Sequence, residues 1–220
     1  MNIFDILGPV MVGPSSSHTA GAVKIGYISQ KLLGEPVTKA NIGLYGSFLL
    51  TGKGHGTTKA IVAGLLGMKP DNEDIPHSFE KAEQKGLKFN ITEANLKDAH
   101  PNSVLLEISG ESGKSLDIVG ESLGGSIINI ARIDGLNANI SGDYPTLICS
   151  NTDVPGMVAK VSTILAVSNI NIANLQLYRS SRGHSSVFIA ECDQEISKET
   201  LREIENLNGI AKVSYLSLED

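Results

Sequence analysis

The sequence predicts an α+β fold of two domains, residues 1–142 and 146–220. Two turn-rich stretches, 134–139 and 141–145, mark the boundary with their glycine, asparagine, aspartate and proline residues. Before this boundary, strand and helix patterns follow each other in the way of a mixed α/β domain. After it, the hydrophobic pattern predicts the order βαββαβ in about 75 residues, which is the ferredoxin-like split unit.

The first domain is expected to begin with a helix over 20–33, where apolar residues recur at the three-and-four spacing of one helix face. Thr19 is the expected N-cap and Gly34 the expected stop. Residues 68–86 are polar and contain two prolines, so a loop with one helical turn at most is expected there. The remaining expected elements are a strand at 40–48, a glycine-rich loop at 52–56, a helix at 57–66 closed by Gly67, and strands at 87–92, 103–109, 114–119 and 126–133, with a hairpin turn at 110–113.

The second domain carries two helix patterns between its strands. Pro155 is expected at the first position of a helix whose apolar face is Val158, Val161 and Leu165. Ser197 is expected to cap a second helix, with Leu201, Ile204 and Leu207 on its apolar face. The expected strands are 146–150, 170–178, 185–192 and 210–218, with a turn at 180–183.

Composition narrows the class of protein. The chain has 220 residues, 41% of them hydrophobic and 19% charged, so a soluble globular protein is expected. The net charge is −6 and no Lys/Arg cluster occurs, so we expect no nucleic-acid partner. No stretch reaches the roughly 18 apolar residues of a membrane span, and residues 1–7 do not have the basic start of a signal peptide.

The chain has two cysteines, Cys149 and Cys192, at a spacing that fits no common metal site. We expect both to be buried thiols of a protein in the reducing cytoplasm. Two cysteines cannot supply the four thiolates that an iron–sulfur cluster requires.

The stretch 13–19 is the most informative part of the chain. It holds Ser15, Ser16, Ser17, His18 and Thr19 directly before the first expected helix. Hydroxyls, an imidazole and free backbone N–H groups would meet at a helix N-terminus, which suits a carboxylate or a phosphate. The alternative is a serine-rich loop that only caps the helix.

Two further histidines are candidates for proton transfer. His55 stands in the glycine-rich stretch 52–56, which lacks the order of a phosphate-binding loop but allows close approach to a ligand. His55 could act as a general base or as a donor, and the alternative is a surface histidine in a tight turn. His100 lies just before a strand and could point into the same cleft; the alternative is an ordinary loop histidine. His77 and His184 have no comparable surroundings.

Polar residues also gather in the second domain. The loop 151–156 joins the first expected strand to a helix, and Asn151 and Asp153 lie in it. Asn171 begins the next strand. These side chains are candidates for a ligand site, and the alternative is turn chemistry in which Asp153 caps the helix.

Together these motifs resemble the β chain of the two-subunit, iron–sulfur L-serine dehydratases. The residues that carry the resemblance are Gly-Pro-Ser-Ser-Ser-His-Thr (13–19), Leu-Tyr-Gly-Ser-Phe-Leu-Leu-Thr-Gly-Lys-Gly-His-Gly-Thr (44–57), His-Pro-Asn-Ser (100–103) and Gly-Gly-Ser-Ile (124–127). The first domain is then expected to be similar to an allosteric-substrate-binding domain, as in some phosphoglycerate dehydrogenases. The stretches 153–158 and 169–173 resemble an ACT domain.

The resemblance implies an enzyme that converts L-serine to pyruvate and ammonia. A separate α subunit would ligate a [4Fe–4S] cluster, which acts as Lewis acid on the serine hydroxyl while a base removes the α-proton. His55 and His100 would be catalytic, and Ser15, Ser16, Ser17, His18 and Thr19 would bind substrate on the face presented to that partner.

For the ACT domain, the resemblance implies a ligand at Asn151, Asp153 and Asn171, often across a homodimer interface. The sequence departs from the family pattern at Asn151, where serine-sensing relatives often have histidine. Two other functions stay open. One is a stand-alone amino-acid sensor, which needs no proton acceptor such as His55. The other is a metal-dependent hydrolase using the three histidines, against which the scarcity of nearby carboxylates counts.

Overall fold

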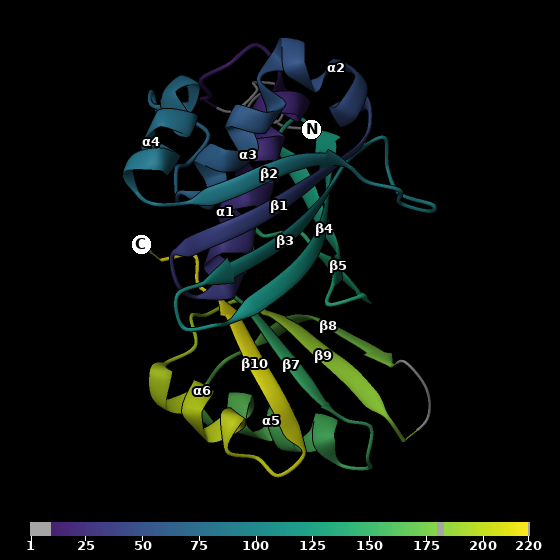
Figure 1. Ribbon diagram of the computed structural model, residues 1–220. Coiled ribbons are helices and arrows are strands. Elements are labelled where there is room, and N and C mark those ends of the chain that lie inside the picture. The colour runs from purple at the N-terminus through teal and green to yellow at the C-terminus, as the bar shows by residue number, and fades with distance from the viewer. Residues whose placement is uncertain (1–9, 180–182, 220) are drawn as a thin grey trace, which may run out of the picture. The chain divides into compact units, whose positions relative to one another are not determined.

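In the computed structural model, which describes residues 10–179 and 183–219, the chain divides after Gly135 into two units (Figure 1). The first unit has a sheet with the strand order β2-β1-β3-β4-β5, in which only β1 and β2 run parallel. The full strand order of this sheet ends, after β5, with β6 (Leu136–Ile140), which begins the second unit. The turn predicted at 134–139 is therefore wrong for most of its length. The first unit contains η2 (Ser16–Gly21), α1 (Ala22–Leu33), β1 (Val37–Gly46), α2 (Ser47–His55), α3 (Thr57–Leu65), η3 (Ile75–His77), α4 (Ser78–Gln84), β2 (Lys88–Glu93), β3 (Asn102–Gly110), β4 (Ser115–Gly124) and β5 (Ile127–Ile133).

Helices α1 and α3 pack so closely that their backbones touch. A Cβ atom on Gly26 of α1 would overlap the carbonyl oxygen of Ile61, and one on Gly64 of α3 would overlap that of Val23. Helix α1 also lies against β3, β4 and β5. Glycine at both crossing positions therefore brings α3, and with it the end of α2, close to the start of α1.

Several predicted elements of the first unit are confirmed. Gly34 ends α1 in the left-handed conformation with φ 76°, as its sequence position predicts. Gly67 follows α3 in the same way with φ 86°. The four strands from β2 to β5 are present, and the hairpin between β3 and β4 closes at Gly110.

Other predictions for this unit are wrong. Thr19 is not the N-cap, because a π-helical turn, η2, precedes α1 and the Ser15 side chain caps it by accepting from the backbone N–H of His18. The glycine-rich stretch 52–56 is not a loop, since residues 52–55 are the second half of α2 and only Gly56, with φ 68°, breaks the helix. The polar stretch 68–86 contains η3 and the seven-residue helix α4, more than the one turn expected.

The second unit has the predicted βαββαβ order. Its elements after β6 are β7 (Thr146–Thr152), α5 (Met157–Val167), β8 (Ile172–Arg179), β9 (Ser185–Cys192), α6 (Lys198–Glu205) and β10 (Ile210–Leu216). The strand order is β10-β7-β9-β8, and Figure 1 shows α5 and α6 on one face of this sheet. The core between them contains Leu147, Cys149, Val161, Leu165, Phe188, Ala190, Cys192 and Ile204.

Ser197 caps α6 as predicted, its hydroxyl accepting from the N–H of Thr200. Pro155 is not the first helical residue, because Gly156 with φ 91° intervenes and α5 begins at Met157. Most of the turn predicted at 180–183 lies outside the described residues. Both cysteines are buried, as expected. Among the residues described, no helix is long and apolar enough to cross a membrane.

Candidate functional site

A polar cluster surrounds the half-buried imidazole of His18, in the π-helical turn before α1. Its Nδ1 lies 3.0 Å from the hydroxyl of Ser17. Its Nε2 lies 3.1 Å from the hydroxyl of Ser47 and 3.0 Å from that of Thr51, one turn apart on α2. The ring also meets the buried Phe48 edge-on at a centroid distance of 5.3 Å. The His18 ring therefore ties the turn 16–21 to the first turn of α2.

His55, the last residue of α2, lies beside this ring. The two imidazole centroids are 5.0 Å apart. The His55 Nδ1 lies 3.0 Å from the backbone oxygen of Thr51, and the His55 backbone oxygen accepts from the hydroxyl of Thr19. Burial lowers the pKa of His18, the neighbouring His55 lowers it further, and a hydrogen bond with Ser47 acts in the opposite direction. These effects together lower the pKa of His18 and favour its neutral imidazole.

The loop of His100 reaches the same cluster by two routes. The backbone oxygen of Pro101 accepts from the N–H of Ser47 at 2.7 Å. Gly46 makes this approach possible, since with φ 57° it takes a conformation unfavourable for other residues. On the other side, the side-chain amide of Asn102 donates to the backbone oxygen of Ser122. The hydroxyl of Ser122 in turn donates to the backbone oxygen of Ser17 at 2.9 Å. His18, His55 and the His100 loop thus belong to one hydrogen-bonded assembly.

Within this loop, His100 is held at three points. Its ring Nδ1 accepts from the backbone N–H of Asn102 at 3.1 Å, and its backbone oxygen accepts from the Ser103 hydroxyl. Its backbone N–H donates to Glu121 Oε1 at 3.2 Å, while Oε2 of the same carboxylate accepts from Asn129. The half-buried Glu121 carboxylate therefore anchors the loop to β4.

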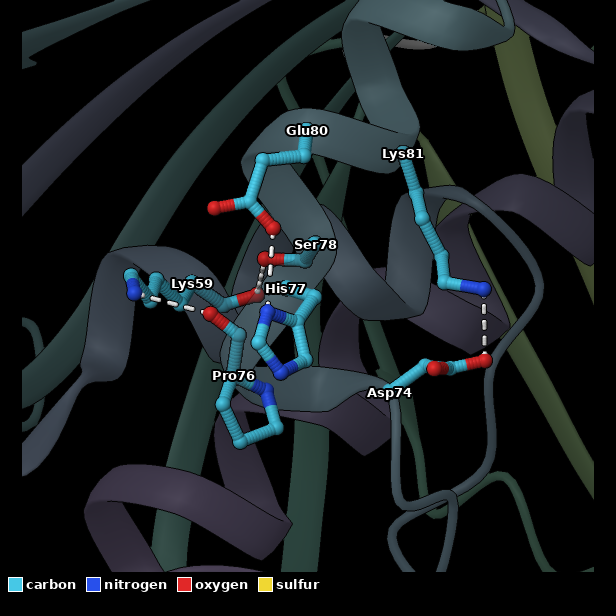
Figure 2. Close-up of polar contacts among 7 residues, drawn as sticks. All are labelled: Lys59, Asp74, Pro76, His77, Ser78, Glu80 and Lys81. Atoms are coloured by element: carbon cyan, nitrogen blue, oxygen red, sulfur yellow. Dashed lines mark hydrogen bonds and ion pairs between the residues drawn. The ribbon is translucent and has the colours of Figure 1, made fainter.

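A cavity of about 200 Å³ lies next to His55. Its lining includes Gly13, Thr19, His55, Lys59 and Pro76. Pro76 and the residues after it are held to α3, as Figure 2 shows: the Lys59 ammonium donates to the Pro76 carbonyl at 2.8 Å, and the Ser78 hydroxyl donates to the Lys59 carbonyl at 2.8 Å. The cavity is large enough for a small molecule next to His55.

The second unit has a cavity of about 210 Å³ between β7, β9 and the start of α5. Asn151 and Asp153 line it at one end of the sheet, together with the apolar Val158, Leu177 and Phe188. The buried Asn151 amide donates to the hydroxyl of Ser186 at 2.8 Å, opposite it on β9. Asp153 accepts from the backbone N–H of Gly183 at 3.0 Å and caps no helix.

Asn171 does not join this cavity. It precedes β8, whereas the cavity lies at the other end of that strand, where Tyr178 pairs with Val187. Its amide donates to the Asp193 carboxylate at 2.6 Å. Within one chain, the predicted ligand residues are therefore divided between the two ends of the sheet.

Comparison with known proteins shows which family this chain resembles. Residues 2–130 match the family model "Serine dehydratase beta chain", and residues 146–209 match the ACT domain model. The "Probable L-serine dehydratase, beta chain" of Bacillus subtilis is 37% identical over 216 residues, which cover 98% of each chain. The "L-serine dehydratase, beta chain" of Peptoniphilus asaccharolyticus is 35% identical over 98% of this chain and 97% of that protein.

The chain belongs to the serine dehydratase beta chain family. Its C-terminal unit is an ACT domain. A more distant relative, the "D-3-phosphoglycerate dehydrogenase" of Archaeoglobus fulgidus, is 28% identical over 201 residues, which cover 90% of this chain and 37% of that protein.

In this serine dehydratase beta chain, the predicted site residues differ in how they are placed. Ser17, His18 and His55 come together, while Thr19 is buried, donates to the His55 backbone oxygen and lines the cavity next to His55. Ser15 serves as a cap and Ser16 begins η2. His55 ends α2, and α3 begins two residues later at Thr57.

The residues of the assembly that were not predicted from the sequence include Ser47, Thr51, Glu121 and Ser122. Ser47 and Thr51 lie within the motif 44–57, and their four-residue spacing on a helix was the available signal once α2 was recognised. No local pattern around Glu121 or Ser122 marks them, since only the pairing of β4 in the sheet brings them to the site.

The residues of this beta chain do not fit an iron–sulfur cluster. Both cysteines are in the core of the second unit, where burial raises the pKa of Cys149 to about 12 and that of Cys192 to about 11. Such thiols are protonated at neutral pH, whereas cluster ligation requires thiolates. In the described part of the chain, no three His, Cys, Asp or Glu residues are arranged to hold a metal ion.

Proposed function

We propose that this chain is the β subunit of an L-serine dehydratase, which converts L-serine to pyruvate and ammonia together with an α subunit. The observation that carries the proposal is the assembly of His18, His55 and the His100 loop within the region that matches the family. The relatives of nearly full length bear the same name, and "beta chain" implies a second chain.

In this proposal, His55 and His100 are the catalytic residues. Dehydration of serine requires a group that takes the α-proton, and a half-buried imidazole at a cavity suits that task. Ser15, Ser16, Ser17, His18 and Thr19 form the substrate-binding segment, of which Ser17 and His18 lie nearest to His55. The hydroxyl of Ser17 and the ring of His18 can exchange their mutual hydrogen bond for one to a substrate carboxylate.

We assign the [4Fe–4S] cluster to the α subunit, since the two cysteines of this chain do not fit it. The same buried free thiols support a place in the reducing cytoplasm. As domain bounds we propose 1–142 for the serine dehydratase β-chain domain and 146–220 for the ACT domain.

The two-chain proposal is tested by reconstitution. The purified chain, assayed anaerobically with iron and sulfide, should not deaminate L-serine. Addition of an α subunit with its cluster should produce pyruvate. Turnover by this chain alone would refute the need for a partner, and an inactive complex with intact cluster would refute the proposed reaction.

A stand-alone amino-acid sensor is the second candidate, and the 210 Å³ cavity beside Asn151 and Asp153 favours it. Titration calorimetry of the isolated chain with L-serine and other small amino acids tests this function. Binding to a chain that shows no activity with any α subunit would favour the sensor, whereas activity on reconstitution would favour the enzyme.

We further propose that the ACT domain forms a homodimer through the edge strand β8. Leu175 and Leu177 on this strand are 44% and 50% exposed, and β8 has a neighbour on one side only in the sheet order. A second copy beside β8 is also the arrangement in which Asn171 of one chain could approach the cavity of the other.

The dimer is tested by sedimentation of the full chain. Leu177→Glu should shift the chain toward monomer at micromolar concentration. Val167→Glu is the matched control, because Val167 is 83% exposed at the end of α5 and is not on β8. A monomeric parent chain, or equal effects of both variants, would count against the β8 interface.

A further inference from the structure

We propose that backbone groups hold His55 and His100 in opposite tautomers, so that His55 offers a proton acceptor and His100 a hydrogen-bond donor. A neutral imidazole carries one proton on two nitrogens, and the partner of one nitrogen decides the state of the other. In both histidines, Nδ1 meets a backbone group that has only one role. The assignment of catalytic roles rests on the proposed function, whereas the tautomers do not.

For His55, the partner is the backbone oxygen of Thr51, 3.0 Å from Nδ1. A carbonyl oxygen can only accept, so Nδ1 carries the proton. Nε2 is then left with a free lone pair. Because Thr51 belongs to the same helix as His55, one turn earlier, the helix itself supplies this acceptor.

For His100, the partner is the backbone N–H of Asn102, 3.1 Å from Nδ1. An amide N–H can only donate, so Nδ1 is bare and Nε2 carries the proton. The backbone of His100 is fixed on both sides, by Glu121 at its N–H and by Ser103 at its carbonyl oxygen. The ring therefore has little freedom to turn away from Asn102.

The two histidines belong to one assembly: Ser47 binds the His100 loop through its N–H and the His18 ring through its hydroxyl, and the His18 ring lies 5.0 Å from the His55 ring. In the proposed reaction, His55 Nε2 takes the proton as the Cα–H bond of L-serine breaks. The electron pair of that bond forms the Cα–Cβ double bond, and the hydroxyl leaves with its bonding pair. The hydroxide becomes water with the proton from His55, while His100 keeps its proton and donates a hydrogen bond to a substrate oxygen.

The tautomers are tested on the full chain alone, without its partner. The chain is labelled with ¹⁵N-histidine and long-range proton–nitrogen spectra are recorded at about pH 8, where a histidine of ordinary pKa is neutral. We expect a protonated Nδ1 in His55 and a protonated Nε2 in His100. His55→Gln and His100→Gln assign the two rings, because each removes one set of signals. The reverse tautomer, or a mixture, in either ring would overturn the proposal for that ring.

The roles are tested in the reconstituted enzyme. Glutamine can donate where Nε2–H donates, but its amide cannot take up a proton. His55→Gln should therefore lower kcat about 10²–10⁴-fold. His100→Ala should lower it about 10²-fold, and His100→Gln should recover most of that loss.

Equal losses in His100→Gln and His100→Ala, or a His55→Gln enzyme within about threefold of the parent, would overturn the roles. Inactivity of the parent complex would refute the proposed function instead, and the spectra of the isolated chain would still decide the tautomers.

Discussion

The polar residues predicted to form sites are arranged differently in the two units of this chain. In the first unit, side chains and backbone groups from four distant segments hydrogen-bond one another around His18, His55 and His100. In the second unit, Asn151 and Asp153 lie at one end of the sheet and Asn171 at the other. The first site is thus assembled within one chain, whereas the residues predicted for the second are not brought together by it.

The proposed functions of the two units account for this difference. The position of a group that transfers a proton must be fixed to within a fraction of an ångström of the productive geometry. Rigid helix and strand ends with hydrogen-bonded neighbours provide that precision. A regulatory ligand is better placed where its binding can connect two chains, because it then stabilises one assembly over another. The following predictions separate the two units experimentally.

The largest effect is expected at the histidine cluster. His55→Ala should lower kcat of the reconstituted enzyme about 10²–10⁴-fold, as loss of a general base does. His77→Ala is the control, since its exposed ring pairs with the exposed Glu80 carboxylate (Figure 2). It should leave kcat within about threefold of the parent. If His55→Ala remains that close to the parent with cluster content unchanged, His55 is not the base.

Gly64→Ala should destabilise the first unit by about 1–3 kcal/mol, because the added methyl group overlaps the backbone of α1. Unfolding in urea followed by circular dichroism measures this loss. Both cysteines are in the second unit, so their labelling by a thiol reagent reports on that unit alone. Unchanged labelling would show that the units unfold separately, whereas a parallel shift would show a single cooperative transition.

Glu195→Gln should affect the second unit in a pH-dependent way. Burial raises the pKa of Glu195, but hydrogen bonds from Tyr215 and from the backbone of Leu218 outweigh it and lower the pKa below the ordinary value. A lowered pKa in the folded state contributes stability above the pKa of the unfolded state and loses it as pH falls through the folded value. The parent should therefore be more stable than Glu195→Gln at pH 7.

This difference should shrink as the pH falls below about 4.5. Labelling of Cys149 and Cys192 in urea with a pyridyl disulfide, which also reacts in acid, measures it. Tyr215→Phe is the companion variant, because it removes the hydroxyl that donates to Glu195 at 2.5 Å. A constant difference between parent and Glu195→Gln from neutral to acid pH would contradict this account.

The smallest effect is expected at Thr57, the first residue of α3. Its hydroxyl is buried and has no hydrogen-bond partner among the described residues. Thr57→Val keeps the shape of the side chain and removes an unsatisfied polar group, so it should stabilise the first unit by about 1 kcal/mol. Destabilisation in the urea experiment would indicate that the hydroxyl has a partner in solution.

The sequence by itself determined the elements whose signals are local. The αL glycines after α1 and α3, the Ser197 cap, the hairpin at 110–113 and the βαββαβ order depend on neighbouring residues, and all could be predicted. The loop predicted from the sequence at 52–56 was wrong. There, tertiary packing overrides the low helix propensity of glycine and makes residues 52–55 part of α2.

Some residues of the candidate site could likewise be predicted from the sequence, and others only from the tertiary structure. His18, His55 and His100 could be named from their surroundings in the sequence, and the structure places His18 and His55 with their rings 5.0 Å apart. Glu121 and Ser122 could not be named, since strand pairing over a long sequence separation brings them there. The ring partner of each histidine is a nearby backbone group, the Thr51 carbonyl oxygen one turn earlier in α2 or the Asn102 N–H two residues later. The tertiary structure decides these contacts only indirectly, because packing makes residues 52–55 helical and Glu121 holds the His100 loop.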